Sequence, residues 1–102
     1  MGLMVYVTCK NKTEARYISM HLLELKLIAC ANFFQSESMY FWKGSIKEGE
    51  EFVLIMKTLK KNFQKIKKEV LKLHSYDVPC IVAYEMKDGH KDYLEWVKKS
   101  IE

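Results

Sequence analysis

The spacing of hydrophobic and polar positions changes several times along the chain, and each change predicts a new element of secondary structure. Residues 3–9 are rich in Val and Tyr and predict a strand. Asn11 and Glu14 then stand three residues apart, the spacing of a capping box at the start of a helix. Apolar residues follow at helical intervals of three, four and three: Ala15, Ile18, Leu22 and Leu25. The start of the chain therefore predicts a strand and then a helix that ends near Lys26.

The middle of the chain has two extended segments with turn residues between them. Residues 29–42 and residues 51–58 have the composition of strands. The segments Lys43-Gly44-Ser45 and Glu48-Gly49 mark a turn region between the two. We therefore expect two strands that follow each other in the chain.

The last third of the chain repeats the order helix, strand, helix. A second helix is indicated by apolar residues at intervals of three, four and three: Phe63, Ile66, Val70 and Leu73. Pro79 begins a strand that continues to Met86, because the missing amide of proline does least harm at the start of a strand. Asp88-Gly89 ends this strand, and a short terminal helix is indicated by Tyr93, Val97 and Ile101.

The predicted order is β-α-β-β-α-β with one more helix at the C-terminal end. This order is that of the split βαβ plan, in which two helices cover one face of an antiparallel sheet. The sequence therefore predicts an α+β fold, a ferredoxin-like βαββαβ sandwich with an extra C-terminal helix. With 102 residues, the chain has the length of a single domain, residues 1–102.

Two of the predicted strands are apolar without interruption, at 52–56 and 80–84. A sheet covered on one face only is expected to alternate apolar and polar side chains, whereas continuous apolar strands indicate burial on both faces. Two helices cannot cover both faces of a four-stranded sheet. An uncovered apolar face drives association, so we expect a homo-oligomer whose subunits cover each other's sheets.

Composition excludes several classes of protein. Hydrophobic residues make up 49% of the chain, and Gly and Pro are scarce, which excludes a disordered or collagen-like chain. Apolar runs stop at five residues, whereas a membrane-spanning helix needs about 20, so we expect a soluble protein without a membrane partner. The cysteines Cys9, Cys30 and Cys80 are odd in number and widely spaced, which favours reduced thiols and a cytoplasmic location.

Five segments carry a resemblance to a known family. They are Ile28-Ala29-Cys30-Ala31-Asn32, Ser38-Met39-Tyr40-Phe41-Trp42-Lys43-Gly44-Ser45-Ile46, Glu51 with Leu54, Lys57 and Thr58, Leu73-His74-Ser75-Tyr76-Asp77-Val78-Pro79, and Asp92-Tyr93-Leu94 with Trp96. In order and spacing they are similar to motifs of the divalent-cation tolerance (CutA) family. The resemblance runs from about residue 4 to about residue 100.

The resemblance implies a tight homotrimer in which long hairpins pair across subunits. It also implies a role in tolerance to copper and other divalent cations, as a metal-binding, scaffolding or signalling module. Some animal members of the family are linked to the anchoring of acetylcholinesterase at membranes. The trimer resembles that of signalling proteins that sense small ligands between subunits, so a metal ion or a small anionic ligand is expected there. No catalytic reaction accompanies the family.

Candidate metal ligands are His74, Cys9 and Cys80, and copper or another divalent cation is the expected ion. Cys9 and Cys80 fall at strand ends and His74 is close to Cys80 in sequence, so the three form a Cys/His set suited to Cu(I). The family's proposed copper-ligating Cys aligns with Thr8, one position from Cys9. The alternatives are a histidine that hydrogen-bonds at a helix C-terminus and cysteines that serve as small core residues.

The net charge of +4 arises from one segment, because residues 57–72 alone carry +6. Four of its lysines recur at intervals of four, three and four: Lys61, Lys65, Lys68 and Lys72. Such a stripe is typical of a solvated helix face. It also supports an alternative function, an anion or nucleic-acid binding module, although the RNA-recognition signature is missing from residues 52–56. The chain has no phosphate-binding loop and no motif of a known nucleophile, so we do not expect an enzyme.

Overall fold

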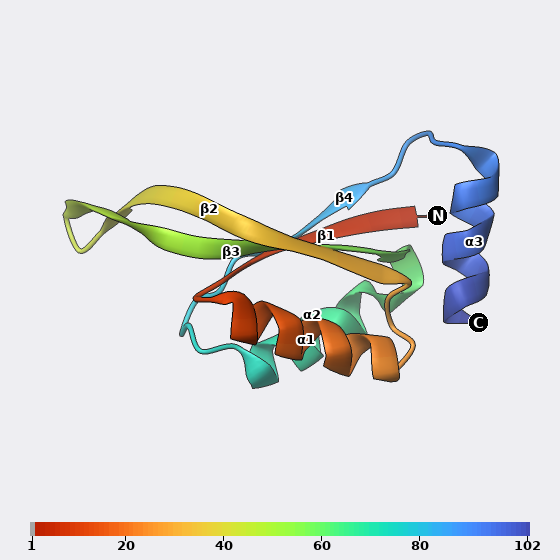
Figure 1. The fold of residues 1–102 in the computed structure, drawn as a ribbon, viewed down its shortest axis with the longest axis horizontal. Coiled ribbons are helices and arrows are strands. Elements are labelled where there is room, and N and C mark those ends of the chain that lie inside the picture. The colour runs from red at the N-terminus through yellow and green to blue at the C-terminus, as the bar shows by residue number, and fades with distance from the viewer. Residues whose placement is uncertain (1) are drawn as a thin grey trace.

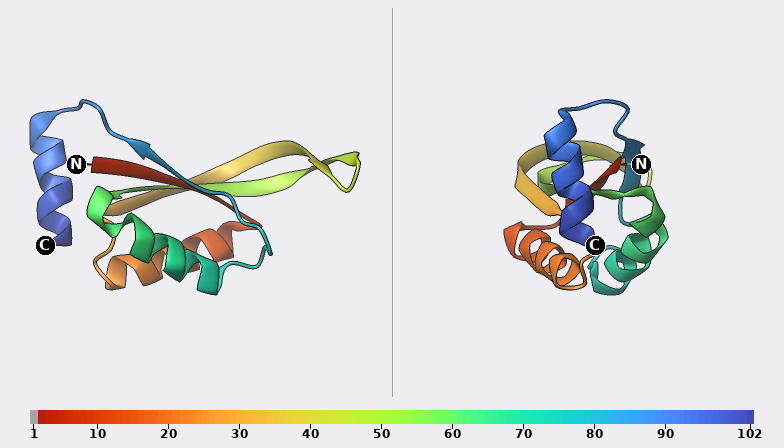
Figure 2. Two further views of the ribbon diagram at one scale, coloured as in Figure 1. Left: turned by 180° about the vertical axis from the view of Figure 1, so that it is seen from behind. Right: turned by 90° about the vertical axis from the view of Figure 1, so that its right-hand side faces the viewer.

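The four strands form one antiparallel sheet with two helices on one face (Figure 1). The computed structural model describes residues 2–102. Its elements are β1 (Gly2–Cys9), α1 (Lys12–Glu24), β2 (Cys30–Trp42), β3 (Ser45–Leu59), a 3-10 turn (Lys60–Asn62), α2 (Phe63–Leu73), β4 (Ile81–Glu85) and α3 (Lys91–Ile101). The strand order is β2-β3-β1-β4. Helix α3 stands across one end of the sheet, beside the N-terminus (Figure 2). The predicted α+β fold, with its extra C-terminal helix, is confirmed.

The hydrophobic core lies between the sheet and helices α1 and α2. Strand β1 alternates strictly between partly exposed and fully buried positions, so one of its faces carries the core. The two helices contribute the apolar residues that their spacing predicted, among them Ile18, Leu22, Ile66 and Val70, all of which are fully buried. The helix-facing side of the sheet is therefore complete within one chain.

Helix α1 begins with the predicted pair Asn11 and Glu14, but the pair bonds differently from a capping box. The Asn11 side chain accepts a hydrogen bond from the Glu14 backbone N–H at 2.9 Å, as expected for an N-cap. The Glu14 carboxylate accepts from the backbone N–H of Lys10 at 2.9 Å rather than from that of Asn11. Its other oxygen is thereby free to bond the loop after α2.

Strands β2 and β3 form a long hairpin that closes with a two-residue turn. Trp42 pairs with Ser45, and the residues between them, Lys43 and Gly44, have φ angles of 51° and 79°. Two consecutive positive φ angles are the mark of a type I′ turn, which matches the twist of a hairpin. The predicted turn at Glu48-Gly49 is wrong, because β3 already begins at Ser45 and Gly49 pairs with Ser38.

The hairpin projects beyond the layer of helices (Figure 1). The radius of gyration is 14.2 Å, whereas a compact chain of this length has a value of about 12.8 Å. Strand β4 is shorter than predicted, because it begins at Ile81, two residues after Pro79. None of the helices in residues 2–102 combines the length and the apolar character needed to cross a membrane.

The face of the sheet opposite the helices is apolar and open. By strand alternation this face carries Tyr6, Phe34, Val82 and Tyr84. Phe34 is 50% exposed, Val82 41% and Tyr84 56%. The second apolar face that the continuous apolar strands predicted is therefore present, and Phe34, Val82 and Tyr84 on it remain open to solvent.

Candidate functional site

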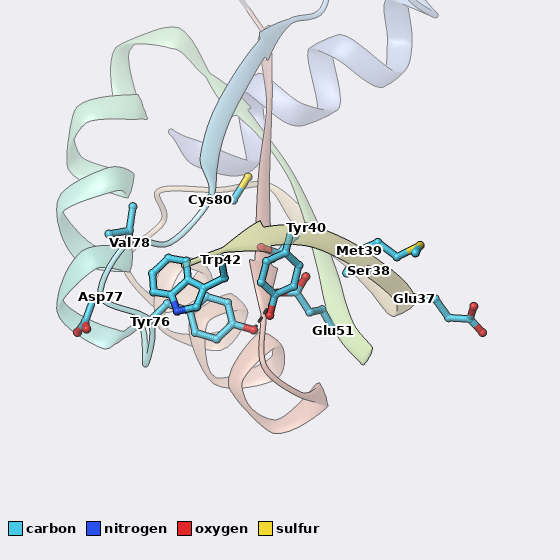
Figure 3. A pocket seen from close by; sticks show the side chains of 11 residues that line it. Glu37, Ser38, Met39, Tyr40, Trp42, Glu51, Tyr76, Asp77, Val78 and Cys80 are labelled. Carbon is cyan, nitrogen blue, oxygen red and sulfur yellow. Dashed lines mark hydrogen bonds between the residues drawn. The ribbon is translucent and has the colours of Figure 1, made fainter. Parts of the chain in front are cut away.

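A groove of about 710 Å³ lies where the hairpin leaves the body of the sheet (Figure 3). Its lining comes from the end of β1, both strands of the hairpin and the loop between α2 and β4: Thr8, Tyr40, Trp42, Glu51, Tyr76 and Cys80 are among the residues that form it. A volume of this size is within the range of small-molecule sites.

One side of the groove is formed by aromatic side chains that leave the same face of β2. Ser38, Tyr40 and Trp42 stand at every second position of β2, so their side chains leave the strand on the same face. Tyr40 and Trp42 line the groove together with Tyr76, which comes from the loop (Figure 3). Tyr40 is 50% exposed and Trp42 is 51% exposed, so each ring offers an open face.

Tyr76 and Glu51 join the two sides of the groove. The Tyr76 hydroxyl donates a hydrogen bond of 2.8 Å to Oε2 of Glu51. Partial burial, this hydrogen bond and the negative charge of Glu51 raise the pKa of Tyr76 well above its ordinary value. The phenol therefore stays neutral and keeps donating at any physiological pH.

The groove is negative although the chain is positive overall. Three carboxylate residues line it, namely Glu37, Glu51 and Asp77, and among the described residues no Lys, Arg or His does. A small anion placed in the groove meets like charge only.

A buried polar cluster lies next to the groove, on the core side of the sheet. Sγ of Cys9, a carboxylate oxygen of Glu14 and a ring nitrogen of His74 all lie within 4.8 Å of one another. Cys9 is fully buried, and the His74 side chain has no exposed surface. The structure thus brings together two of the three predicted metal ligands and adds Glu14.

Both ring nitrogens of His74 take part in hydrogen bonds. Nδ1 accepts from the backbone N–H of Tyr76 at 3.1 Å, so it carries no hydrogen. Nε2 therefore holds the proton of the neutral ring and donates it to the backbone oxygen of Thr8 at 2.8 Å. The backbone N–H of His74 bonds Val70 at the end of α2. In this arrangement His74 ties the end of β1 to the loop that carries Tyr76.

Glu14 and Cys9 are held in opposite protonation states. Burial alone would raise the pKa of Glu14, but the hydrogen bonds that it accepts from Lys10 and Ser75 bring that pKa below its ordinary value. Burial, followed by the negative charges of Glu14 and Glu51, raises the pKa of the Cys9 thiol to about 12. The cluster thus holds a carboxylate, a neutral imidazole and a protonated thiol.

Glu14 predicts an acid limit on stability. Its folded pKa lies below the ordinary value of 4.5, so its contribution is complete above that pH and is lost as the pH falls through the folded pKa. We expect the free energy of unfolding of the wild type, measured in urea, to fall as the pH drops below about 4.5. In Glu14→Gln this free energy should fall less steeply with pH. The control is Glu24→Gln, which removes an exposed carboxylate at the end of α1. Equal acid slopes in all three proteins would contradict this role.

Cys80 lies apart from the other two predicted ligands. It lines the groove beside Thr8, whereas Cys9, the next residue of β1, points into the core. Neighbouring residues of a strand face opposite sides of the sheet, which separates the two thiols. All three cysteines are free, and Cys30 lies 3.5 Å from the Tyr93 hydroxyl at the other end of the sheet.

Apart from Cys80, the groove residues were not among the predicted site residues. Tyr40, Trp42, Glu51 and Tyr76 appeared in the sequence as parts of three family motifs, but their spacing gave no sign that the motifs meet. The predicted lysine stripe is exposed, with Lys61 in the 3-10 turn and the other three lysines on α2. Lys72 bonds Glu69 at 3.1 Å.

Together, the sheet order, the two helices on one face and the groove at the base of the hairpin define a small α+β sandwich protein of the ferredoxin-like class. The family model for the CutA1 divalent ion tolerance protein matches residues 3–100. The chain therefore belongs to the CutA1 divalent ion tolerance family, as the sequence motifs predicted.

Individual relatives agree with this assignment. The divalent-cation tolerance protein CutA of Archaeoglobus fulgidus is 39% identical over 98 residues, which are 96% of each chain. A solved structure of the periplasmic divalent cation tolerance protein CutA from that organism has a TM-score of 0.97 at 38% identity and covers all of both chains. The divalent cation tolerance protein of Thermus thermophilus has a TM-score of 0.94 at 37% identity over 98% of each chain.

Proposed function

We propose that this chain serves divalent-cation tolerance as a homotrimeric binding and scaffolding module rather than as an enzyme. The observation that carries the proposal is the open apolar face of the sheet, including Phe34, Val82 and Tyr84. Patches of this kind on a small protein mark association surfaces. The family resemblance supplies the number three.

The exposed area of the protomer supports association. Its surface is 6993 Å². A compact globular chain of this mass exposes about 6,000 Å². We attribute the additional exposed surface to the projecting hairpin and the open sheet face, both of which neighbouring subunits can cover.

The state of the thiols supports a role without catalysis. Burial and nearby Glu residues raise the pKa of Cys9 to about 12 and also raise the pKa of Cys80. A cysteine nucleophile needs the opposite shift. Three free cysteines are also in keeping with the proposed cytoplasmic location.

Copper is the ion that we propose for the Cys9 and His74 pair, and Cys80, on the other side of the sheet, is not part of this site. A thiol and an imidazole are donors that suit Cu(I). Copper binding at this pair requires changes in protonation and hydrogen bonding, however. Cys9 must lose the proton that its high pKa retains, and His74 must release either the Tyr76 amide or its own Nε2 hydrogen. When bound, the ion would supply charge and cross-linking at the end of β1.

Cu(I) titration tests this site. We expect wild type to bind one ion per chain through Cys9, with an affinity that rises about tenfold per pH unit because one thiol proton leaves for each ion. Cys9→Ser should abolish this binding, whereas Cys80→Ser should leave it unchanged, because the Cys80 thiol lies on the other side of the sheet. Cys30→Ser, whose thiol lies beside Tyr93, is the matched control. Unchanged isotherms in Cys9→Ser would exclude the cluster, and unchanged isotherms in His74→Ala would remove His74 as a ligand.

A further inference from the structure

The buried cluster of Cys9, Glu14 and His74 contains a carboxylate that the copper proposal does not use. We propose that Glu14 is the third ligand of this cluster and makes it a site for a divalent ion, Zn²⁺, a proposal that rests on metal binding by Cys9 and His74. Cys9 and the His74 side chain are already buried within one chain. Coverage of the open sheet face by neighbouring subunits therefore does not alter the surroundings of the cluster.

Glu14 holds a buried negative charge that has no cationic partner among residues 2–102. The residue is 8% exposed, and its carboxylate accepts the backbone N–H groups of Lys10 and Ser75, each at 2.9 Å. In the described part of the chain the one basic side chain within 4.0 Å of this carboxylate is His74, whose ring is neutral. Buried charges in proteins are paired or bind a metal ion, because an isolated charge is costly to bury. The backbone hydrogen bonds hold the carboxylate in place, and its attraction for a cation remains available.

The His74 ring is already in the protonation state of a metal ligand. Its Nε2–H donates to the backbone oxygen of Thr8 at 2.8 Å, and metal-bound histidines commonly donate their other ring N–H to a carbonyl of this kind. Nδ1 carries a lone pair and lies 4.0 Å from Oε1 of Glu14. This lone pair accepts from the Tyr76 amide at 3.1 Å, the longer of the two ring hydrogen bonds. We therefore assign Nδ1 as the ligand atom, so that binding replaces the longer hydrogen bond and keeps the shorter one.

The Glu14 carboxylate can bind an ion without losing the hydrogen bonds that hold it. A carboxylate has about four acceptor positions, and the backbone N–H groups of Lys10 and Ser75 occupy one on each oxygen. A further acceptor position on each oxygen remains for the ion. The two N–H groups are then the outer contacts that orient a ligating carboxylate.

The charges of the three donors favour a divalent ion. Binding replaces the S–H bond of Cys9 with a metal–sulfur bond, and the proton leaves to solvent. The thiolate of Cys9 and the carboxylate of Glu14 then carry one negative charge each, and the His74 ring carries none. A divalent ion makes this buried site neutral, whereas Cu(I) leaves a net negative charge out of water. Thiolate, imidazole and carboxylate are all ligands of Zn²⁺, whereas Mg²⁺ and Ca²⁺ prefer oxygen donors alone.

Cobalt titration of the wild type tests the divalent site, because Co²⁺ is a coloured substitute for Zn²⁺. We expect one Co²⁺ per chain, with a sulfur-to-cobalt charge-transfer band, and Zn²⁺ should displace it. Cys9→Ser should lack this band, whereas Cys30→Ser, whose thiol lies beside Tyr93, should keep it. X-ray absorption of the zinc-loaded wild type needs no variant and should show one sulfur together with nitrogen and oxygen ligands.

Glu14→Gln separates the third ligand from the other two. Zn²⁺ affinity should fall at least about tenfold, since even the loss of a group that only orients a ligand costs about 10- to 100-fold. Cu(I) affinity should not fall in the same variant, because Cys9 and His74 remain and the site with Cu(I) becomes neutral. The readout is the ratio of the two affinities, since a general loss of stability would lower both. Glu24→Gln, which removes an exposed carboxylate of α1, should bind both ions as the wild type does.

The possible failures distinguish this proposal from the copper site on which it rests. Cu(I) binding by a wild type that binds neither Co²⁺ nor Zn²⁺ would overturn the divalent site and leave the copper site standing. Equal Zn²⁺ affinities in the wild type and a folded Glu14→Gln would remove Glu14 as a ligand. An X-ray absorption spectrum of bound zinc without sulfur would place the ion outside the cluster. Absence of binding by all three ions would overturn both proposals.

Discussion

Val82→Glu is expected to dissociate the proposed trimer, lowering the mass in solution from about three chains to one chain of 12.1 kDa. Val82 lies on β4 opposite Tyr6, on the open face of the sheet. A carboxylate buried in an apolar interface costs several kcal/mol, and a symmetric assembly repeats that cost in every subunit. Light scattering after size exclusion measures the mass. Thermal stability should fall as well, because association stabilises the folded chain by mass action.

Tyr17→Glu is the matched control for this experiment. Tyr17 is an exposed aromatic residue of α1, a helix on the opposite side of the sheet, and its replacement should leave the mass unchanged. Circular dichroism should show that Val82→Glu remains folded, because Val82 is 41% exposed in the protomer and outside the core. If Val82→Glu kept the mass of wild type, the open sheet face would not be the interface.

The fold was predictable because each element carries its own local signal. The apolar spacing of α1 and α2 and the cap at Asn11 are properties of short segments. The beginning of β3 was missed for the same reason. Gly49 resembles a turn residue, but its partner Ser38 across the hairpin decides its conformation. Pairing between strands is not visible in a local pattern.

The site was harder to predict because it depends on contacts between distant segments. Glu51 and Tyr76 are 25 residues apart and meet through one hydrogen bond. The distance between His74 and Thr8 along the chain is 66 residues. The sequence placed His74 at the end of a helix and offered hydrogen bonding there as an alternative to metal binding. The position at the helix end is confirmed, and metal binding remains a prediction.

His74→Ala is expected to lower the free energy of unfolding by about 2 to 4 kcal/mol. The side chain has no exposed surface, so its removal leaves a cavity. It also leaves the Thr8 backbone oxygen without its donor and the Tyr76 amide without its acceptor. Denaturant unfolding of the wild type and the variant at one protein concentration measures the difference.

The third histidine in sequence order supplies the comparison for His74. His90 precedes α3, is exposed and makes no side-chain capping bond, so His90→Ala should change stability by less than about 0.5 kcal/mol. A His74→Ala protein as stable as His90→Ala would contradict the structural role and leave metal binding as the remaining reason for a histidine at this position.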